Sequence, residues 1–232
     1  MKKLLISCNI TGEIKENLLK YGYEPLLLPE YRRLNKAVSA HADMLIFRFE
    51  NNIITYGGYY NENKALFDTI AENYSIIKEE KEPQEEYPAD ISLNALALGK
   101  KLFCLQKHTS GLVKENFSEI INVKQGYTRC STCVLKDNCI ITADMTIKKA
   151  AESSGVEVLL IKEGGIILEG MSCGFIGGAS FCDFEEKKLF FFGEIKKHTD
   201  YEKIKKIAGA YGIEIICLSQ DRLTDYGGAV IL

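Results

Sequence analysis

The sequence predicts an α/β fold in which five strand-strand-helix-strand units form one closed ring. Three observations lead to this prediction. One complete copy of the unit can be recognised in residues 127–161. The strands that close the units recur at intervals of roughly 40 to 55 residues, a spacing typical of propellers. Finally, the chain ends in a strand that has no unit of its own. Together these features predict a single domain that spans residues 1–232.

The central unit shows the pattern most clearly. Residues 127–135 are rich in Thr, Val, Tyr and Cys and predict a strand, residues 136–138 a turn, and residues 139–142 the returning strand. Asp144 is a suitable N-cap for a helix that carries apolar residues at helical spacing. Residues 156–161 are continuously apolar, which predicts a closing strand buried on both faces.

Three other segments of the chain have their strands and helix in the same order as the central unit. In each, two strands joined by a short turn precede a helix and a closing strand. The fourth unit places its helix at a capping box formed by Thr199 and Glu202. The predicted segments are strands 43–50 and 53–56, helix 61–73 and strand 74–77; strands 90–98 and 101–105, helix 110–117 and strand 120–123; and strands 175–182 and 188–192, the helix from 199, and strand 213–218.

The two ends of the chain supply the fifth unit. Residues 2–7 predict a strand, residues 12–21 a helix and residues 23–28 a second strand. The unit lacks only the strand that precedes the others, and residues 225–232 can provide it. Pairing of the first strand with the last would close the ring and leave no free sheet edge.

The composition is that of a globular protein. Of its 232 residues, 46% are hydrophobic and 26% charged, and the net charge of −3 offers no basic surface for nucleic acid. No segment approaches the ~18 apolar residues of a membrane span. The apolar residues 4–6 are too few for a signal peptide, which predicts a cytoplasmic location. Most of the eight cysteines lie in apolar strands, for example Cys104, Cys139 and Cys217, and are expected to be reduced. The sequence does not predict the oligomeric state.

Five such units in a closed ring resemble the pentein fold, the β/α-propeller of the guanidino-group modifying enzymes. This fold is shared by arginine deiminase, agmatine deiminase, dimethylarginine dimethylaminohydrolase, the amidinotransferases and a non-catalytic ribosome anti-association factor. Several motifs are similar, more narrowly, to a bacterial family, common in clostridia, that has this fold and no assigned reaction. They are Gln125-Gly126-Tyr127 with Arg129-Cys130-Ser131, Ile141-Thr142-Ala143-Asp144, Gly174-Phe175-Ile176-Gly177-Gly178-Ala179-Ser180, and Asp225-Tyr226-Gly227-Gly228.

The resemblance does not extend to the catalytic residues of the hydrolases. Segment 87–94 is similar to the strand whose acidic residues hold the substrate guanidinium, but only Asp90 is kept, and Asn94 stands in place of the second acid. Where the hydrolases have a catalytic His, residues 175–178 contain none. The nucleophilic Cys expected after the C-terminal glycines is also missing from residues 229–232. The chain therefore lacks two of the three essential groups of a standard cysteine amidinohydrolase.

Polar residues on the axial strands predict a ligand pocket at one mouth of the ring. Such residues are unusual in apolar strands unless they are hydrogen-bonded or face a ligand. Adjacent glycines can let backbone N–H groups approach a ligand, although crowding at the axis explains them equally well. The candidate ligand-binding residues are Asp90, Asn94, Arg129, Cys130, Ser131, Gly177, Gly178 and Tyr226; Arg48 also lies on an axial strand.

Two function classes follow from these residues, and a third stays open. The first is a binding protein for a small polar ligand, guanidino or amino-acid-like. The second is an enzyme with Cys130 as a relocated nucleophile, whose thiol pKa the neighbouring Arg129 would lower. The third is a non-catalytic interaction protein. No cofactor or metal is expected, because Cys130 and Cys133 would point to opposite faces of a strand.

Overall fold

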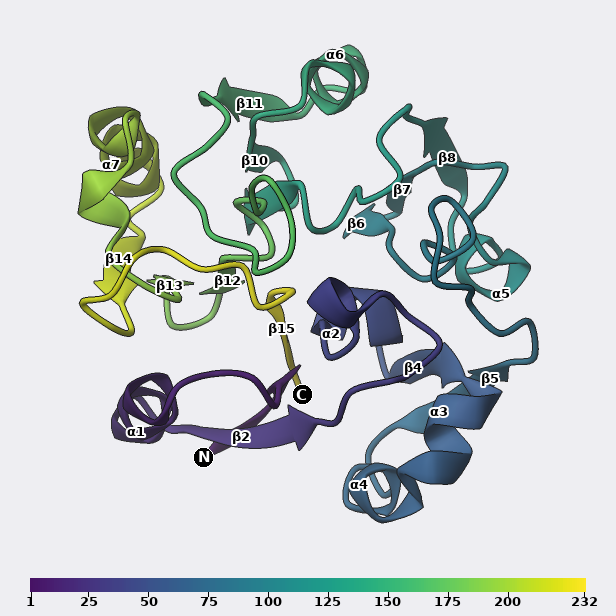
Figure 1. The fold of residues 1–232 in the computed structure, drawn as a ribbon. Coiled ribbons are helices and arrows are strands. Elements are labelled where there is room, and N and C mark those ends of the chain that lie inside the picture. Colours follow the sequence, from purple (N-terminus) through teal and green to yellow (C-terminus); the bar gives the residue numbers. More distant parts are fainter.

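The computed structural model describes residues 1–232, which form five three-stranded sheets arranged as blades around a central axis (Figure 1). In every blade the inner strand is antiparallel to the middle strand, and the middle strand is parallel to the outer one. This is the strand-strand-helix-strand unit that the sequence predicted. The fivefold β/α-propeller fold is therefore confirmed.

The strands are β1 (Lys2–Ser7), β2 (Tyr23–Leu28), β3 (Ile46–Phe49), β4 (Asn52–Tyr56), β5 (Ser75–Glu79), β6 (Leu96–Leu98), β7 (Lys101–Cys104), β8 (Glu119–Asn122), β9 (Thr132–Lys136), β10 (Cys139–Thr142), β11 (Glu157–Leu160), β12 (Ser180–Asp183), β13 (Lys188–Phe191), β14 (Glu214–Cys217) and β15 (Ala229–Ile231). The helices are α1 (Gly12–Lys20), α2 (Ala42–Leu45), α3 (Gly57–Glu62), α4 (Lys64–Asp68), α5 (Gly111–Lys114), α6 (Met145–Ser153) and α7 (Tyr201–Ala210), with 3-10 turns η1 (Lys36–Val38) and η2 (Ile195–Lys197). We call β15-β1-β2 the terminal blade, and number the others one to four in chain order.

The terminal blade is built from both ends of the chain. β15 pairs antiparallel with β1, with Leu5 opposite Val230, and β1 pairs parallel with β2. The N–H of Leu232 also donates to the carbonyl of Lys3 at 2.9 Å. The two termini lie close together in Figure 1, so the ring is closed by pairing of the first strand with the last.

Local capping signals fix several helices. Oδ1 of Asp144 accepts hydrogen bonds from the N–H groups of Thr146 and Ile147 at 2.7 and 2.8 Å, so the predicted N-cap is confirmed. The predicted capping box at Thr199 is wrong, because the N-cap of α7 is Asp200. Its carboxylate instead accepts from the backbone N–H of Lys162 at 2.6 Å.

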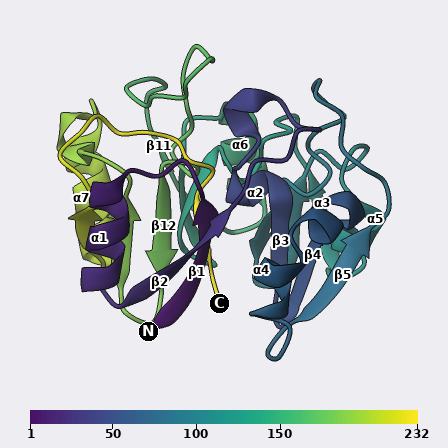
Figure 2. The same ribbon diagram turned by 60° about the horizontal axis from the view of Figure 1, so that its bottom comes forward.

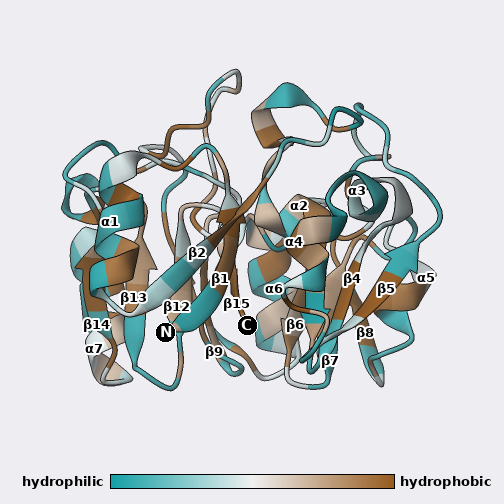
Figure 3. Ribbon diagram, turned by 90° about the horizontal axis from the view of Figure 1, so that it is seen from below, coloured by the Kyte–Doolittle hydropathy of each residue, from teal (hydrophilic) through white to brown (hydrophobic).

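The hydrophobic core is divided among the blades. The largest buried cluster contains 23 residues and fills the space among the terminal, first and second blades. Another cluster joins the terminal blade to the fourth, where Phe181 stacks on Phe190 at 4.7 Å between ring centroids and Tyr23 meets Phe190 edge-on. Much of the strand surface is brown in Figure 3, whereas the turns at the lower edge are mostly teal. No helix is both long enough and apolar enough to cross a membrane.

The structure corrects the predicted boundaries in a systematic way. All five inner strands begin three to six residues later than predicted: at Ile46, Leu96, Thr132, Ser180 and Ala229. The residues in front of them form tight turns, or the short helix α2, because local backbone hydrogen bonds such as Ser131 N–H to Tyr127 O at 2.9 Å hold them in place. The helix predicted at 61–73 is two shorter helices, α3 and α4. Finally, β11 is only half-buried and so is not covered on both faces.

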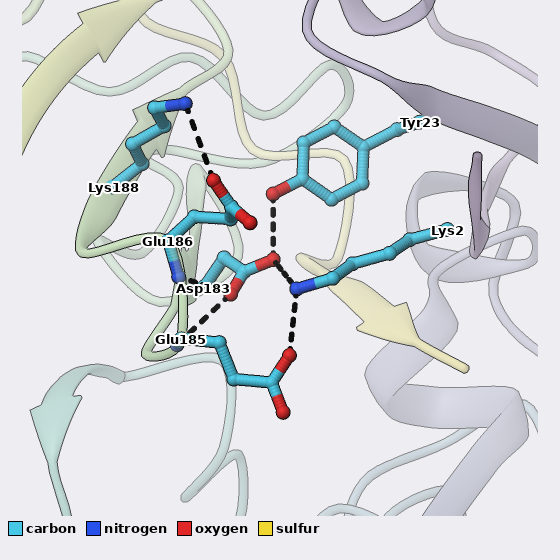
Figure 4. A network of polar contacts seen from close by, with 6 residues as sticks. All are labelled: Lys2, Tyr23, Asp183, Glu185, Glu186 and Lys188. Carbon is cyan, nitrogen blue, oxygen red and sulfur yellow. Dashed lines mark hydrogen bonds and ion pairs between the residues drawn. The ribbon is translucent and has the colours of Figure 1, made fainter.

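A network of polar side chains fastens the terminal blade to the fourth (Figure 4). Oδ2 of Asp183 accepts from Nζ of Lys2 at 2.8 Å and from the hydroxyl of Tyr23 at 2.7 Å, while Oδ1 accepts the N–H groups of Glu185 and Glu186. Burial opposes ionisation of Asp183, but the hydrogen bonds from Lys2, Glu186 and Tyr23 outweigh it and hold the pKa of the carboxyl below its usual value. The carboxylate therefore stabilises the folded state.

This depressed pKa predicts a pH-dependent cost for the variant Asp183→Asn. A carboxyl with a lowered folded pKa contributes stability above its unfolded pKa of about 3.9, and loses that contribution as the pH falls through the folded pKa. We expect Asp183→Asn to lower the free energy of unfolding by about 2 kcal/mol at neutral pH. Urea unfolding over a pH series should show the difference from wild type shrinking below about pH 3.9. A difference that does not change with pH would contradict this role of the charge.

Candidate functional site

The segments in front of the inner strands meet at the axis, close to α2 (Figure 2). Backbone hydrogen bonds connect them directly. The N–H of Asp43 donates to Gly227 O at 3.1 Å, the N–H of Gly178 to Cys130 O at 2.9 Å, and the N–H of Gly228 to Gly178 O at 2.7 Å. Four blades are thereby joined at a single place on the axis.

Five polar side chains are buried where these segments meet, and we call them the axial cluster: His41, Asp43, Asn94, Cys130 and Asp225. None is more than 5% exposed. The thiol of Cys130 donates to Oδ2 of Asp43 at 2.7 Å and accepts from Nδ2 of Asn94 at 3.3 Å. Nδ1 of His41 lies 3.8 Å from Oδ1 of Asp225. A thiol, an imidazole and two carboxylates are thus gathered in the protein interior.

Backbone groups hold the outer members of the axial cluster in place. Asp225 accepts the N–H of Phe175 at 2.8 Å and that of Gly227 at 2.9 Å. Oδ1 of Asn94 accepts the N–H of Arg129 at 2.8 Å. Because these bonds fix Asp225 and Asn94 on either side, the cluster has little freedom to rearrange.

Burial decides the protonation of the axial cluster. It raises the pKa of Asp43 to about 8, with the negative charge of Asp225 adding to the effect. Burial also raises the pKa of Cys130 well above that of a free thiol, and the carboxylates of Asp43 and Asp225 raise it further. The pKa of His41 is lowered by burial, although Asp225 opposes this. The thiol is therefore protonated at neutral pH, which is the reverse of the lowering by Arg129 that the sequence suggested.

The glycines at the axis are required by close packing. A Cβ on Gly177 would collide with the backbone carbonyls of Thr132, Arg129 and Cys130, and one on Gly178 with the carboxylate of Asp225. Their neighbours across the axis, Gly227 and Gly228, have positive φ angles of 78° and 65°. The N–H groups of Gly178, Gly227 and Gly228 all donate within the protein. Of the two explanations for the glycine pairs, crowding is therefore the one that this geometry favours.

A cavity of about 420 Å³ runs along the axis beside the cluster. Each of the five inner strands contributes an apolar side chain to its wall: Phe47, Leu96, Val134, Phe181 and Val230. At the N-terminal ends of the inner strands the cavity is lined by Asp43, Arg129 and Gly227. At their C-terminal ends it is lined by charged residues, namely Lys2, Arg48, Asp137, Asp183 and Glu185. Volumes of this order are typical of small-molecule sites.

Arg129 is the cation at the N-terminal end of this central cavity. Its Nη1 donates to Thr132 O at 3.0 Å, which is the one hydrogen bond made by its guanidinium. No carboxylate lies within salt-bridge distance of it, unlike Lys2, which pairs with both Asp183 and Glu185. A guanidinium has five N–H donors in a planar fork, so Arg129 lines the cavity with donors that have no protein acceptor.

The structure brings together five of the eight candidate residues from the sequence: Asn94, Arg129, Cys130, Gly177 and Gly178 lie at the axis. The other three lie elsewhere. Asp90 accepts the hydroxyl of Tyr127 at 2.6 Å, and Tyr226 packs against Phe192. Ser131 lines a separate cavity of about 90 Å³. Asp90, the one acidic residue kept from the guanidinium-binding strand, therefore does not line the central cavity, whereas Asn94, which stands in place of the second acid, belongs to the axial cluster.

Three members of the axial cluster were missed by sequence reasoning: His41, Asp43 and Asp225. His41 lies in the connection between the predicted strands 23–28 and 43–50, where it is the buried residue that precedes α2. Asp43 and Asp225 were placed at the starts of predicted strands, and Asp225 belonged to a recognised motif. The signal that could have found them is their shared position, three to five residues before an inner strand.

The fold and the axial cavity define a class of protein, the pentein-type β/α-propellers. Dimethylarginine dimethylaminohydrolase from Pseudomonas aeruginosa, a mutant complexed with citrulline, is similar with a TM-score of 0.55 and 11% sequence identity, over 94% of this chain and 92% of that chain. Agmatine deiminase from C. jejuni is similar with a TM-score of 0.56 and 12% identity, over 94% and 87%. SxtG, an amidinotransferase from Microseira wollei, has a TM-score of 0.55 and 11% identity, over 94% and 77%. At such identities the likeness shows the fold alone.

Residues 5–230 match the model of a family of unknown function, DUF6873, and the chain belongs to this family. No curated protein matches the sequence.

Proposed function

We propose that the protein binds a small amino-acid-like ligand in the central cavity, with the ligand carboxylate on Arg129. The observation that carries this proposal is the guanidinium of Arg129, which faces the cavity with a single protein hydrogen bond and no ion pair. A partly buried cation of this kind favours a bidentate anion such as a carboxylate.

The charged residues at the opposite end of the cavity indicate which chemical group the other end of the ligand carries. Asp137 lies there without an ion pair, whereas Asp183 and Glu185 are both paired with Lys2. Carboxylates select guanidinium or ammonium groups, so a ligand with a cationic side chain matches both ends. The apolar wall between them suits a methylene chain. The similar enzyme from P. aeruginosa is complexed with citrulline, which is an amino acid, and this likeness supports the same ligand class.

A thermal-shift screen with paired ligands tests the proposal. Arginine and agmatine share the guanidinium and the methylene chain, but only arginine has a carboxylate. We expect arginine, or another amino acid of the screen such as citrulline, to raise the melting temperature, because a ligand that binds only the folded state stabilises it. Agmatine should raise it less. If no carboxylate-bearing compound raised the melting temperature, or if the decarboxylated partners did so equally, the proposal would be wrong.

A second candidate function is catalysis by Cys130 on an amidine or amide. The observation in its favour is that a thiol, an imidazole and a carboxylate are gathered in the axial cluster. Three observations speak against catalysis. Cys130 is only 2% exposed, the pKa of its thiol is raised, and the thiol donates a hydrogen bond to Asp43. A reacting substrate could reach it only after the axial segments moved.

Thiol alkylation of the folded protein separates the two candidates. Cys8 and Cys173 are half-exposed, whereas Cys130 and Cys133 are both buried. We expect iodoacetamide to modify Cys130 as slowly as Cys133, and at least about tenfold more slowly than Cys173, because access and thiolate character limit the rate. Peptide mapping by mass spectrometry over time measures these rates. Fast modification of Cys130 alone among the buried thiols would favour catalysis.

A further inference from the structure

The axial cluster contains three residue types that bind transition metals. His41, Asp43 and Cys130 each offer one ligand atom, and these atoms all lie within 4.8 Å of one another. The side chains come from two segments that are far apart in sequence, and all three are buried. Only small rotations are needed to place the three atoms around one ion, because metal–ligand bonds of about 2.0–2.3 Å set similar separations between ligands.

Two atoms of the cluster have no hydrogen-bond partner. They are Nδ1 of His41 and Oδ1 of Asp43, whose residues are only 4% and 5% exposed. Buried polar atoms are normally satisfied, so each orphan needs an explanation, and an ion is one of the standard ones. Both of these unpartnered groups lie beside the thiol of Cys130.

We propose that His41, Asp43 and Cys130 form a binding site for one divalent transition-metal ion of the Zn²⁺ type. A thiolate and an imidazole together favour zinc over magnesium or calcium, which prefer all-oxygen sites. The ion displaces to solvent both the thiol proton and the proton on the Asp43 carboxyl, and it lies between Cys130 and Asp43. One thiolate and one carboxylate then balance the two positive charges of the ion, so no net charge is buried among the ligands.

Asp225 completes the surroundings of this site. Its Oδ1 lies 3.8 Å from Nδ1 of His41, and backbone N–H groups of Phe175 and Gly227 hold the carboxylate in place. In zinc sites a carboxylate commonly backs the coordinating histidine and fixes the orientation of its ring. With the ion on the other ring nitrogen, the His41 ring would close on Asp225 and Nδ1 would donate to its carboxylate, so metal binding would satisfy Nδ1 indirectly and Oδ1 of Asp43 by coordination.

This site differs from the Cys130–Cys133 pair considered from the sequence. Cys133 belongs to the hydrophobic cluster between the third and fourth blades, and it is not among the grouped ligands. It is therefore a matched control: a buried thiol three residues away that should make no contribution. The site is also separate from the ligand proposal, because metal binding does not depend on Arg129.

Cobalt titration of the full chain tests the metal site. Co²⁺ bound to a thiolate gives a charge-transfer band in the near ultraviolet, with d–d bands in the visible. We expect one equivalent of Co²⁺ to produce these bands in wild type and in Cys133→Ser, and the charge-transfer band to be lost in Cys130→Ser. Asp43→Asn should weaken Co²⁺ binding at least about tenfold. No band in wild type, or an equal band in Cys130→Ser, would overturn the proposal, as would loss of the band in Cys133→Ser.

X-ray absorption on wild-type protein loaded with Zn²⁺ gives a test that needs no variant to fold. We expect one sulfur among the atoms that coordinate zinc, with nitrogen and oxygen making up the remainder. No sulfur, or two or more, would contradict a site made by His41, Asp43 and Cys130. Either result leaves the ligand proposal untouched, since no amino acid is present in these measurements.

Discussion

Replacing Gly178 with alanine is expected to destabilise the protein by about 3 kcal/mol or more. The added Cβ would collide with the carboxylate of Asp225, which is fully buried and cannot move into solvent. Asp225 is held by the N–H groups of Phe175 and Gly227, and displacing it would leave these donors without partners. The free energy of unfolding in urea measures the effect.

Gly209→Ala is the matched control for this substitution. Gly209 lies in α7, and a Cβ there would have no atom within 4 Å. Alanine in a helix is more favourable than glycine by about 1 kcal/mol, so this variant should be slightly more stable than wild type. If Gly178→Ala were as stable as Gly209→Ala, the close packing of the axis described above would be wrong.

Replacing Arg129 with glutamine is expected to weaken binding of a carboxylate-bearing ligand by about 10- to 100-fold. A hydrogen bond to a charged group contributes about 1.5–3 kcal/mol, and the bidentate contact would be lost. Glutamine keeps a polar amide on an unbranched stem, while it removes the charge and the fork of donors. The dissociation constant from isothermal titration gives the size of the loss.

Arg48→Gln is the control for this loss of charge. Arg48 also lines the cavity, but at the C-terminal ends of the inner strands, where its guanidinium lies 5.4 Å from the ring centroid of Tyr74. It should change the affinity by less than about threefold, a free-energy difference typical of an exposed charge. Equal losses in the two variants would mean that overall charge, and not contact with Arg129, sets the affinity.

The architecture could be predicted from the sequence because each blade carries its own local signals. The four units within the chain each have a short turn between the first two strands and a largely apolar closing strand, and the third unit also has the N-cap Asp144. The unpaired C-terminal strand then required a partner, and β1 is the strand that offers one. These signals depend on neighbours in sequence, so they can be recognised without knowledge of the tertiary structure.

The axial cluster could be predicted only in part, for a physical reason. The segments in front of the inner strands are about five residues long, which is too short for periodicity to separate a turn from a strand. The hydrogen bond from Ala179 N–H to Phe175 O, at 3.0 Å, closes such a turn within a predicted strand. A change from strand to turn alters the direction of every side chain, so Asn94 and Cys130 lie in the axial cluster while Ser131 lines a separate cavity.

His41 and Asp225 lie side by side only because the ring of blades closes. The two residues lie near opposite ends of the sequence, and they meet because α2 contacts β15 in the closed ring. The raised pKa of Cys130 has the same origin, since burial and the carboxylates of Asp43 and Asp225 cause it. The sequence shows that Arg129 adjoins Cys130, but it does not show that Asp43 and Asp225 lie beside the thiol and raise its pKa.

A binding cycle tests the central claim, that the carboxylate of the ligand lies on Arg129 in the axial cavity. Isothermal titration would compare arginine and agmatine, each against wild type and Arg129→Gln. We predict that arginine binds wild type more tightly than agmatine does, and that this difference in affinity disappears in Arg129→Gln. Agmatine lacks the carboxylate and the variant lacks the guanidinium, so either change alone removes the same contact. If arginine kept its advantage over agmatine in the variant, its carboxylate would lie elsewhere, and the claim would be contradicted.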